Sequence, residues 1–196
     1  MNWGRRPEQM DAVLPAHDMI ALLVTDVDGT LVTPEKTLTT NAKAAVRRLS
    51  EAGVGFTLVS SRPPRGMASL VATLDVKLPF AAFNGGALVR PDLSIIETHW
   101  LSSRAASGVL DLLDRHDVEA WVFADGDWRL CNPDGPYVAS NRRAVGFDPM
   151  IVQGFEDVID RIDKIVGVSE RPARLAEVEE EARRLLQGEA TTHTVN

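Results

Sequence analysis

Three short apolar segments, each ending in a cluster of polar residues, constrain the fold of this chain more than any other feature. They are Met19–Thr25, Val54–Ser60 and Leu78–Phe83. Continuous apolar runs of this length, rich in β-forming residues, are typical of strands that are buried on both faces, as in a parallel sheet. We therefore expect three neighbouring strands in the first half of the chain.

The segments between these strands have helical patterns. Residues 40–52 carry apolar side chains at helical spacing, with Thr39 or Thr40 as the N-cap and Gly53 at the stop. Residues 63–74 begin with two prolines and continue with an apolar face. Alternating strands and helices with right-handed crossovers predict an α/β fold with a parallel sheet.

Ligands of such sheets bind at the carboxyl ends of the strands. Here those ends are the segments 26–30 (Asp-Val-Asp-Gly-Thr), 60–62 (Ser-Ser-Arg) and 84–85 (Asn-Gly). All three are polar, and all three are expected to meet at one edge of the sheet. This edge is the candidate site.

The second half of the chain has a different pattern, typical of a small α+β unit. A hairpin near residues 90–92 is followed by a helix that Ser102 or Ser103 caps, and Asp125-Gly126 marks a second hairpin of the type I′ class. The remaining predicted elements are a helix at 155–162, a strand at 164–169 and a last helix at 172–187.

Composition excludes several classes of protein. The 196 residues contain 21 basic and 28 acidic side chains, a net charge of −7, and no basic cluster longer than a pair, so we expect no nucleic-acid partner. No apolar run approaches the roughly 20 residues that a membrane span needs. The single cysteine, Cys131, suits a reducing cytoplasm. Only four lysines are present: Lys36, Lys43, Lys77 and Lys164.

The two carboxylates at the end of the first strand, Asp26 and Asp28, can be interpreted in two ways. Asp28-Gly29 could mark an ordinary β-hairpin, because this dipeptide favours tight turns. The polar ends of the other two strands favour a site instead. In that case Asp26 could attack phosphorus as a nucleophile, and Asp28 could serve as general acid and base. Gly29 would let the backbone approach a phosphate.

The motifs resemble those of the haloacid dehalogenase superfamily. Asp26–Leu31 is similar to its first motif and Leu58–Pro63 to its second, while Phe83–Gly86 resembles the Asn-Gly segment of the Cof-type sugar-phosphatase branch. The resemblance implies a Rossmann-like parallel-sheet core, here its N-terminal part, with an inserted α+β cap domain. It also implies a Mg²⁺-dependent phosphatase that acts on a small phosphomonoester such as a sugar phosphate.

The resemblance assigns roles residue by residue. Asp26 is the expected nucleophile and a metal ligand, and Asp28 the acid/base, with its backbone carbonyl on the metal. The second motif usually reads Thr-Gly-Arg, whereas this chain keeps the hydroxyl and loses the glycine. The expected phosphate- and substrate-binding residues are Gly29, Thr30, Ser60, Ser61, Arg62, Asn84 and Gly85.

The expected organisation is an N-terminal arm (1–18), the first half of the core (19–99), a cap (100–188) and the start of a return to the core (189–196). The family's third-motif lysine and fourth-motif acids find no counterpart, since Lys164 is interpreted as a charge on an edge strand of the cap. We therefore expect hydrolysis far below that of a complete enzyme. We also expect an exposed edge along the Asp26 strand, which invites association between copies or poor solubility.

Two other functions remain open. The chain could be a non-catalytic module that binds phosphate or a partner, which binding of a phosphate analogue without turnover would indicate. It could also be a phosphotransferase related to the phosphomannomutases, which share the first motif and a similar cap. Exchange between sugar-phosphate isomers, without release of phosphate, would distinguish this alternative.

Overall fold

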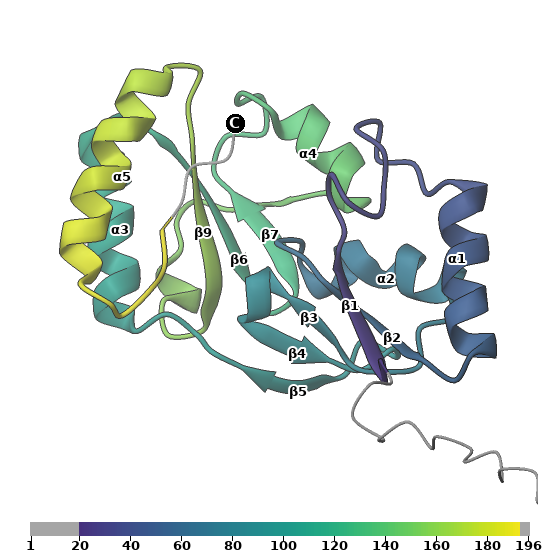
Figure 1. Ribbon diagram of the computed structural model, residues 1–196. Coiled ribbons are helices and arrows are strands. Elements are labelled where there is room, and N and C mark those ends of the chain that lie inside the picture. Colours follow the sequence, from purple (N-terminus) through teal and green to yellow (C-terminus); the bar gives the residue numbers. More distant parts are fainter. Residues whose placement is uncertain (1–19, 193–196) are drawn as a thin grey trace, which may run out of the picture.

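The computed structural model describes residues 20–192, which form two sheets joined by the short segment 99–102 (Figure 1). The first sheet has five strands in the order β1-β2-β3-β4-β5, and its first three strands are parallel. The hairpin β4-β5 completes it in antiparallel fashion. The strands are β1 (Leu22–Asp26), β2 (Gly55–Val59), β3 (Phe80–Ala82), β4 (Ala87–Val89) and β5 (Ile95–Thr98).

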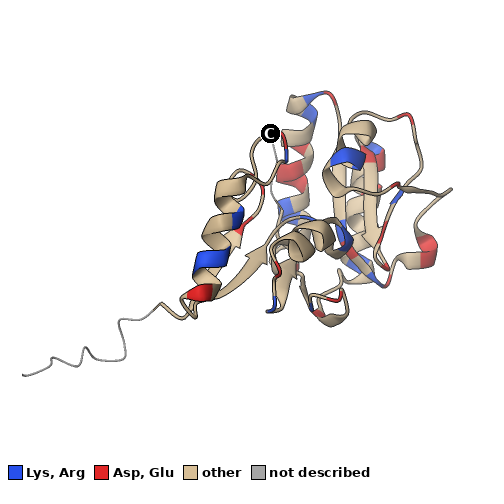
Figure 2. Cartoon of the chain, turned by 90° about the vertical axis from the view of Figure 1, so that its right-hand side faces the viewer, with Lys and Arg blue, Asp and Glu red and all other residues tan. Residues whose placement is uncertain are grey.

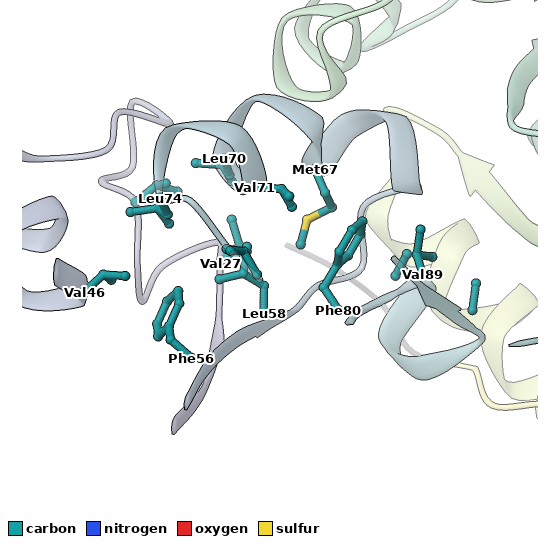
Figure 3. Packing of buried hydrophobic residues seen from close by; sticks show 14 residues of the cluster. Val27, Val46, Phe56, Leu58, Met67, Leu70, Val71, Leu74, Phe80 and Val89 are labelled. Atoms are coloured by element: carbon teal, nitrogen blue, oxygen red, sulfur yellow. The ribbon is translucent and has the colours of Figure 1, made fainter. Parts of the chain in front are cut away.

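Two helices, α1 (Thr40–Glu51) and α2 (Pro64–Thr73), contribute to the core of this sheet. Thr39 caps α1 by accepting a hydrogen bond from the Ala42 amide, and Pro64 occupies the first turn of α2, both as predicted. Both helices bury side chains in one apolar cluster with the sheet (Figure 3). Its members include Val46, Phe56, Leu58, Met67 and Phe80. The α/β prediction is thereby confirmed.

The apolar run of the first strand predicts burial on both faces, and this prediction is wrong, whereas the exposed edge expected along the Asp26 strand is observed. β1 lies at the end of the sheet and pairs only with β2 among the described strands. Leu22, Leu23 and Val24 are exposed, Val24 at 52%. An apolar run reports that a strand favours burial, but it cannot tell how many neighbours cover that strand.

The second sheet has four strands in the order β8-β7-β6-β9. Helix α3 packs on one of its faces and is covered in turn by α5, while α4 packs on the other face. The elements are α3 (Ser103–Arg115), β6 (Glu119–Ala124), β7 (Asp127–Leu130), α4 (Val138–Val145), β8 (Met150–Ile151), β9 (Ile162–Val168) and α5 (Pro172–Leu186).

The turn between β6 and β7 confirms the type I′ hairpin. Asp125 and Gly126 both have positive φ, 56° and 80°, as this turn requires at its two central positions. Ser102 caps α3, as predicted, by accepting a hydrogen bond from the Ala105 amide.

Some predicted elements differ from the structure. The helix expected at 155–162 is a single 3-10 turn, η2 (Glu156–Val158), because Ile162 already belongs to β9 and pairs with Ala124. A second 3-10 turn, η1 (Phe83–Gly85), follows β3. Helix α4 and strand β8 were not predicted. The expected arm, 1–18, lies outside the described residues.

Charged side chains of both signs are interspersed along the chain, as the cartoon in Figure 2 shows from the side of α1. This distribution agrees with the absence of any basic cluster longer than a pair in the sequence. Within residues 20–192, no helix combines the length and the apolar character that crossing a membrane requires.

Candidate functional site

The register of the first sheet brings the ends of β1, β2 and β3 to the same level. Asp26 pairs with Val59, and Val59 pairs with Ala81. The loops that follow these three positions therefore meet at one edge, because parallel strands all end on the same side. The structure brings together Asp26, Asp28, Ser60, Arg62 and Asn84 in these loops.

The loop after β1 is a compact turn around the Val27 carbonyl. This oxygen accepts hydrogen bonds from the amides of Leu31 and Val32, at 3.0 and 3.1 Å. Gly29 adopts φ +81°, and a Cβ there would meet no atom within 4 Å, so its backbone conformation alone favours glycine. The segment does not form a hairpin on β1, whose pairing partner is β2.

Asp26 is the last residue of β1, and it is exposed at this edge of the sheet. The Thr30 hydroxyl donates a hydrogen bond to Asp26 Oδ2 at 3.4 Å, which is long and therefore weak. The Thr30 hydroxyl thus contacts the carboxylate that is predicted to be the nucleophile.

Asp28 forms the strongest set of contacts in the site. Arg62 donates from Nε to Asp28 Oδ2 at 2.8 Å and from Nη2 to Oδ1 at 2.7 Å, a bidentate pair. Lys36 donates to the same Oδ1 at 2.8 Å. The Arg62 hydrogen bonds, with smaller contributions from Lys36, lower the pKa of the Asp28 carboxyl to about 2, although burial opposes the shift.

Ser60 links the loop after β2 to the loop after β3. Its side chain is 1% exposed, and its hydroxyl accepts a hydrogen bond from the Arg62 amide at 3.2 Å. Its backbone bonds to Ala81 and, at 2.8 Å, to the amide of Asn84. Asn84 and Gly85 have φ values of 57° and 98°, left-handed conformations that asparagine and glycine adopt readily. The Asn-Gly pair therefore shapes the turn that holds Ser60.

Two lysines also contact residues of the site, although the sequence analysis did not assign either of them to it. Lys36 forms the ion pair with Asp28 that is described above. Lys164, expected to be a charge on an edge strand of the cap, extends from β9 to the loop after β2, where its Nζ donates to the Ser61 carbonyl at 3.2 Å. β9 is indeed an edge strand of the second sheet. The only sequence signal for either residue is the scarcity of lysine, four in 196 residues.

The oxygen atoms at this edge fit a weakly held Mg²⁺. Mg²⁺ is usually bound by one or two carboxylates together with water and substrate phosphate. The Asp28 side chain is occupied by Lys36 and Arg62, whereas the Asp26 carboxylate and the Asp28 backbone carbonyl are oxygen atoms that such an ion can use. No cluster of three or more metal-ligating side chains occurs among residues 20–192.

Comparison with known proteins gives matches over most of the chain. A sequence profile of haloacid dehalogenase-like hydrolases matches residues 23–196. The 5-amino-6-(5-phospho-D-ribitylamino)uracil phosphatase YwtE of Bacillus subtilis is 26% identical over 100 residues, 51% of this chain and 34% of that protein. The pyridoxal phosphate phosphatase YbhA of Escherichia coli is 24% identical over 129 residues, 65% of this chain and 47% of its own length.

The fold also has solved counterparts. A crystal structure of a haloacid dehalogenase-like hydrolase from Bacteroides thetaiotaomicron superposes with a TM-score of 0.77 at 21% identity, covering 87% of this chain and 66% of that one. The matched segments span less than half of the two curated relatives. The similarity therefore covers most of this chain but only part of the proteins that it resembles.

Proposed function

Since the chain belongs to the haloacid dehalogenase-like hydrolase family, we propose that it binds a small phosphate monoester at the edge of the five-stranded sheet and hydrolyses it through Asp26. The observation that carries this proposal is the meeting of Asp26, Ser60 and the Asp28–Arg62 pair on the two adjacent loops that follow β1 and β2. A carboxylate beside a hydroxyl and a guanidinium suits phosphoryl transfer, because the phosphate needs both a nucleophile and charge stabilisation.

In the proposed reaction an Asp26 oxygen attacks phosphorus, and the bond from phosphorus to the ester oxygen breaks. The departing alkoxide takes a proton, which Asp28 supplies in its neutral form. A water molecule then loses a proton to Asp28 and attacks the phosphorus of the acyl phosphate on Asp26, which releases inorganic phosphate and restores both carboxyl groups.

The contacts of Asp28 limit this reaction. With a pKa of about 2, its carboxyl is ionised at neutral pH and can accept a proton but has none to donate. For Asp28 to act as an acid, Arg62 and Lys36 must move away from it, and an arriving phosphate is the anion that could draw them away. This coupling would make substrate binding a condition for proton transfer.

The same observation supports a second candidate function. If Arg62 and Lys36 stay on Asp28 when phosphate binds, the chain binds phosphate without turnover. Such a protein would be a phosphate-binding module that has the family's first two motifs. Measuring binding and turnover on one sample distinguishes the two candidates.

Mg²⁺ is the proposed cofactor, held by the Asp26 carboxylate and the Asp28 backbone carbonyl. When bound, it would screen the negative charge of the phosphate that approaches Asp26. The chain's own residues would hold and orient the phosphate through Ser60, the neighbouring amides and Arg62.

The proposed substrate class is a small phosphorylated metabolite, with a sugar phosphate as the first compound to test. The resemblance to the Cof-type branch supports this choice, and the two curated relatives are named for phosphate esters of small molecules. We also propose a cytoplasmic location, which the single cysteine supports. Finally, we propose that copies of the chain associate along the exposed edge of β1.

The experiment that tests the reaction is hydrolysis of p-nitrophenyl phosphate with and without Mg²⁺. We expect slow, Mg²⁺-dependent turnover, about 100-fold or more below ordinary enzyme rates, because the ion pairs of Asp28 leave its carboxyl without a proton to donate. Asp26→Asn should lower the remaining rate by about a thousandfold or more, since it removes the nucleophile.

Asp75→Asn is the matched control, because Asp75 is an exposed carboxylate that pairs with Lys77 just beyond the C-terminal end of α2. It should leave the rate unchanged. Equal rates for the Asp26 and Asp75 variants would exclude Asp26 as the nucleophile. Turnover at ordinary enzyme rates would disprove the expected impairment while supporting the reaction.

A further inference from the structure

Lys164 connects the second sheet to the candidate site. It lies on β9 opposite Phe123 in the antiparallel register, and its Nζ reaches the Ser61 carbonyl of the loop between β2 and α2. Ser61 stands between Ser60 and Arg62, the two residues of this loop proposed to hold phosphate. A side chain 103 positions further along the chain thus ends against the candidate phosphate site.

The amine of Lys164 is half-buried and has no counter-ion within the described part of the chain. Lys36 and Lys77 pair with Asp28 and Asp75, whereas Lys164 forms no ion pair among residues 20–192. Its Nζ donates to one carbonyl, that of Ser61, and the centroid of the Phe123 ring lies 6.0 Å from Nζ. Burial lowers the pKa of this amine, as expected for a cation removed from water without a balancing charge.

A purely structural role would not require this arrangement. An ammonium group has three N–H donors, and a single carbonyl accepts one of them. The aromatic contact between Phe83 and Phe123, with ring centroids 5.9 Å apart, already joins the two sheets at this place. A neutral side chain could fill the same space at lower cost, because burying an unpaired charge is unfavourable. The remaining donors and the missing negative charge indicate an anionic ligand.

We propose that Lys164 is an anion-binding residue of the candidate site and that its Nζ binds an anionic oxygen of the phosphorylated substrate. The inference rests on the proposed function and adds a residue from the second sheet to it. Two parts of a substrate could supply this oxygen: the phosphate itself, or a second acidic group on the leaving portion. In either case the bound anion holds the second sheet against the first.

The test compares Lys164→Met with Lys77→Met in the full chain. Methionine keeps an unbranched apolar stem and removes the amine, and Lys77 is an exposed control at 75%. The probes are inorganic phosphate, glycerol 3-phosphate and 3-phosphoglycerate, titrated calorimetrically. We expect Lys164→Met to weaken binding by about 10- to 100-fold, the usual effect of losing a charge-assisted hydrogen bond. Lys77→Met should bind as the wild type does, and Lys164→Arg should restore most of the affinity.

The three probes distinguish the two sources of the oxygen. An equal loss for all of them assigns Lys164 to the phosphate, and a loss confined to 3-phosphoglycerate assigns it to a second acidic group. Unchanged affinity for all three overturns the inference. If the wild type binds probes in a Lys164-dependent way but hydrolyses no ester, the inference stands and the proposed reaction fails.

A measurement on the wild-type chain keeps the inference testable if Lys164→Met does not fold. The lysines are dimethylated with ¹³C, and the Lys164 resonance is followed by NMR during a pH titration. Added phosphate or phosphoglycerate should raise the pKa of Lys164, because a bound anion favours its charged form. A pKa that does not move with any probe, or a wild type that binds none of them, overturns the inference.

Discussion

The two sheets of this protein are covered to different extents. In the four-stranded sheet, Trp121 and Phe123 pack with α4 on one face, and Val122 and Ala124 pack with α3 on the other. In the five-stranded sheet, α1 and α2 contribute to one cluster, whereas Leu22 and Val24 of β1 remain about half exposed. Within the described residues, the four-stranded unit completes its own core and the five-stranded sheet does not.

The two sheets also contribute unequally to the candidate site. The well-covered sheet contributes a single amine, Lys164, to the candidate site, while the partly covered sheet supplies the three loops that form it. The buried unit therefore positions one distant cation. The proposed proton transfer by Asp28 would require Arg62 and Lys36, in the loops of the partly covered sheet, to leave its carboxylate.

The largest expected effect tests the coverage of the four-stranded sheet. Trp128 is fully buried and packs against the rings of Trp121 and Phe123, so Trp128→Ala should lower the free energy of unfolding by about 3–5 kcal/mol. Trp100→Ala, at a residue that is 55% exposed, should change it by less than about 1 kcal/mol. Urea titration measures both. Equal losses would show that the two tryptophans are equally covered in solution.

An intermediate effect tests the charges at the open sheet. The pKa of Asp28 lies at about 2, below its ordinary 3.8, so its ion pairs stabilise the fold above about pH 4 and lose this contribution as the pH falls through 2. Arg62→Gln should therefore cost about 1–2 kcal/mol at pH 7 and should flatten the loss of stability between pH 4 and 2.

Arg47→Gln is the control for this prediction, because Arg47 forms an exposed pair with Glu51 on α1. Such pairs contribute between zero and about 1 kcal/mol. Thermal unfolding followed from pH 2 to 7 compares the two variants. If the stability of the Arg62 variant falls between pH 4 and 2 as steeply as that of the wild type, the assignment of the pKa shift of Asp28 to Arg62 is contradicted.

The smallest expected effect concerns association along β1. Val24→Lys places a charge on the exposed edge strand and should shift any self-association toward the monomer by about tenfold in dissociation constant, since charges on edge strands hinder pairing. Met150→Lys changes a similarly exposed residue on β8, an edge of the other sheet, and should have no effect. Light scattering over a range of concentrations measures both, and a wild type that stays monomeric at high concentration would disprove association.

Much of the fold could be predicted because its signals are local. The Thr39 and Ser102 caps, the proline that starts α2 and the Asp125-Gly126 turn all depend on a few neighbouring residues. Helix α4 was missed because its first turn lacks a side-chain cap and Tyr137 precedes it in a left-handed conformation. Gly146, the glycine that ends it, is the signal that could have revealed it.

The sequence alone determined which residues stand at the ends of the first three strands, and therefore that Asp26, Asp28, Ser60, Arg62 and Asn84 meet at one edge. Dihedral preferences and apolar periodicity fix such features over short distances. The tertiary structure decided the partners. It brought Arg62 to Asp28, 34 positions away, and Lys164 to Ser61, 103 positions away. These outcomes depend on how separate elements pack, because a long side chain binds whichever group the fold brings within its reach.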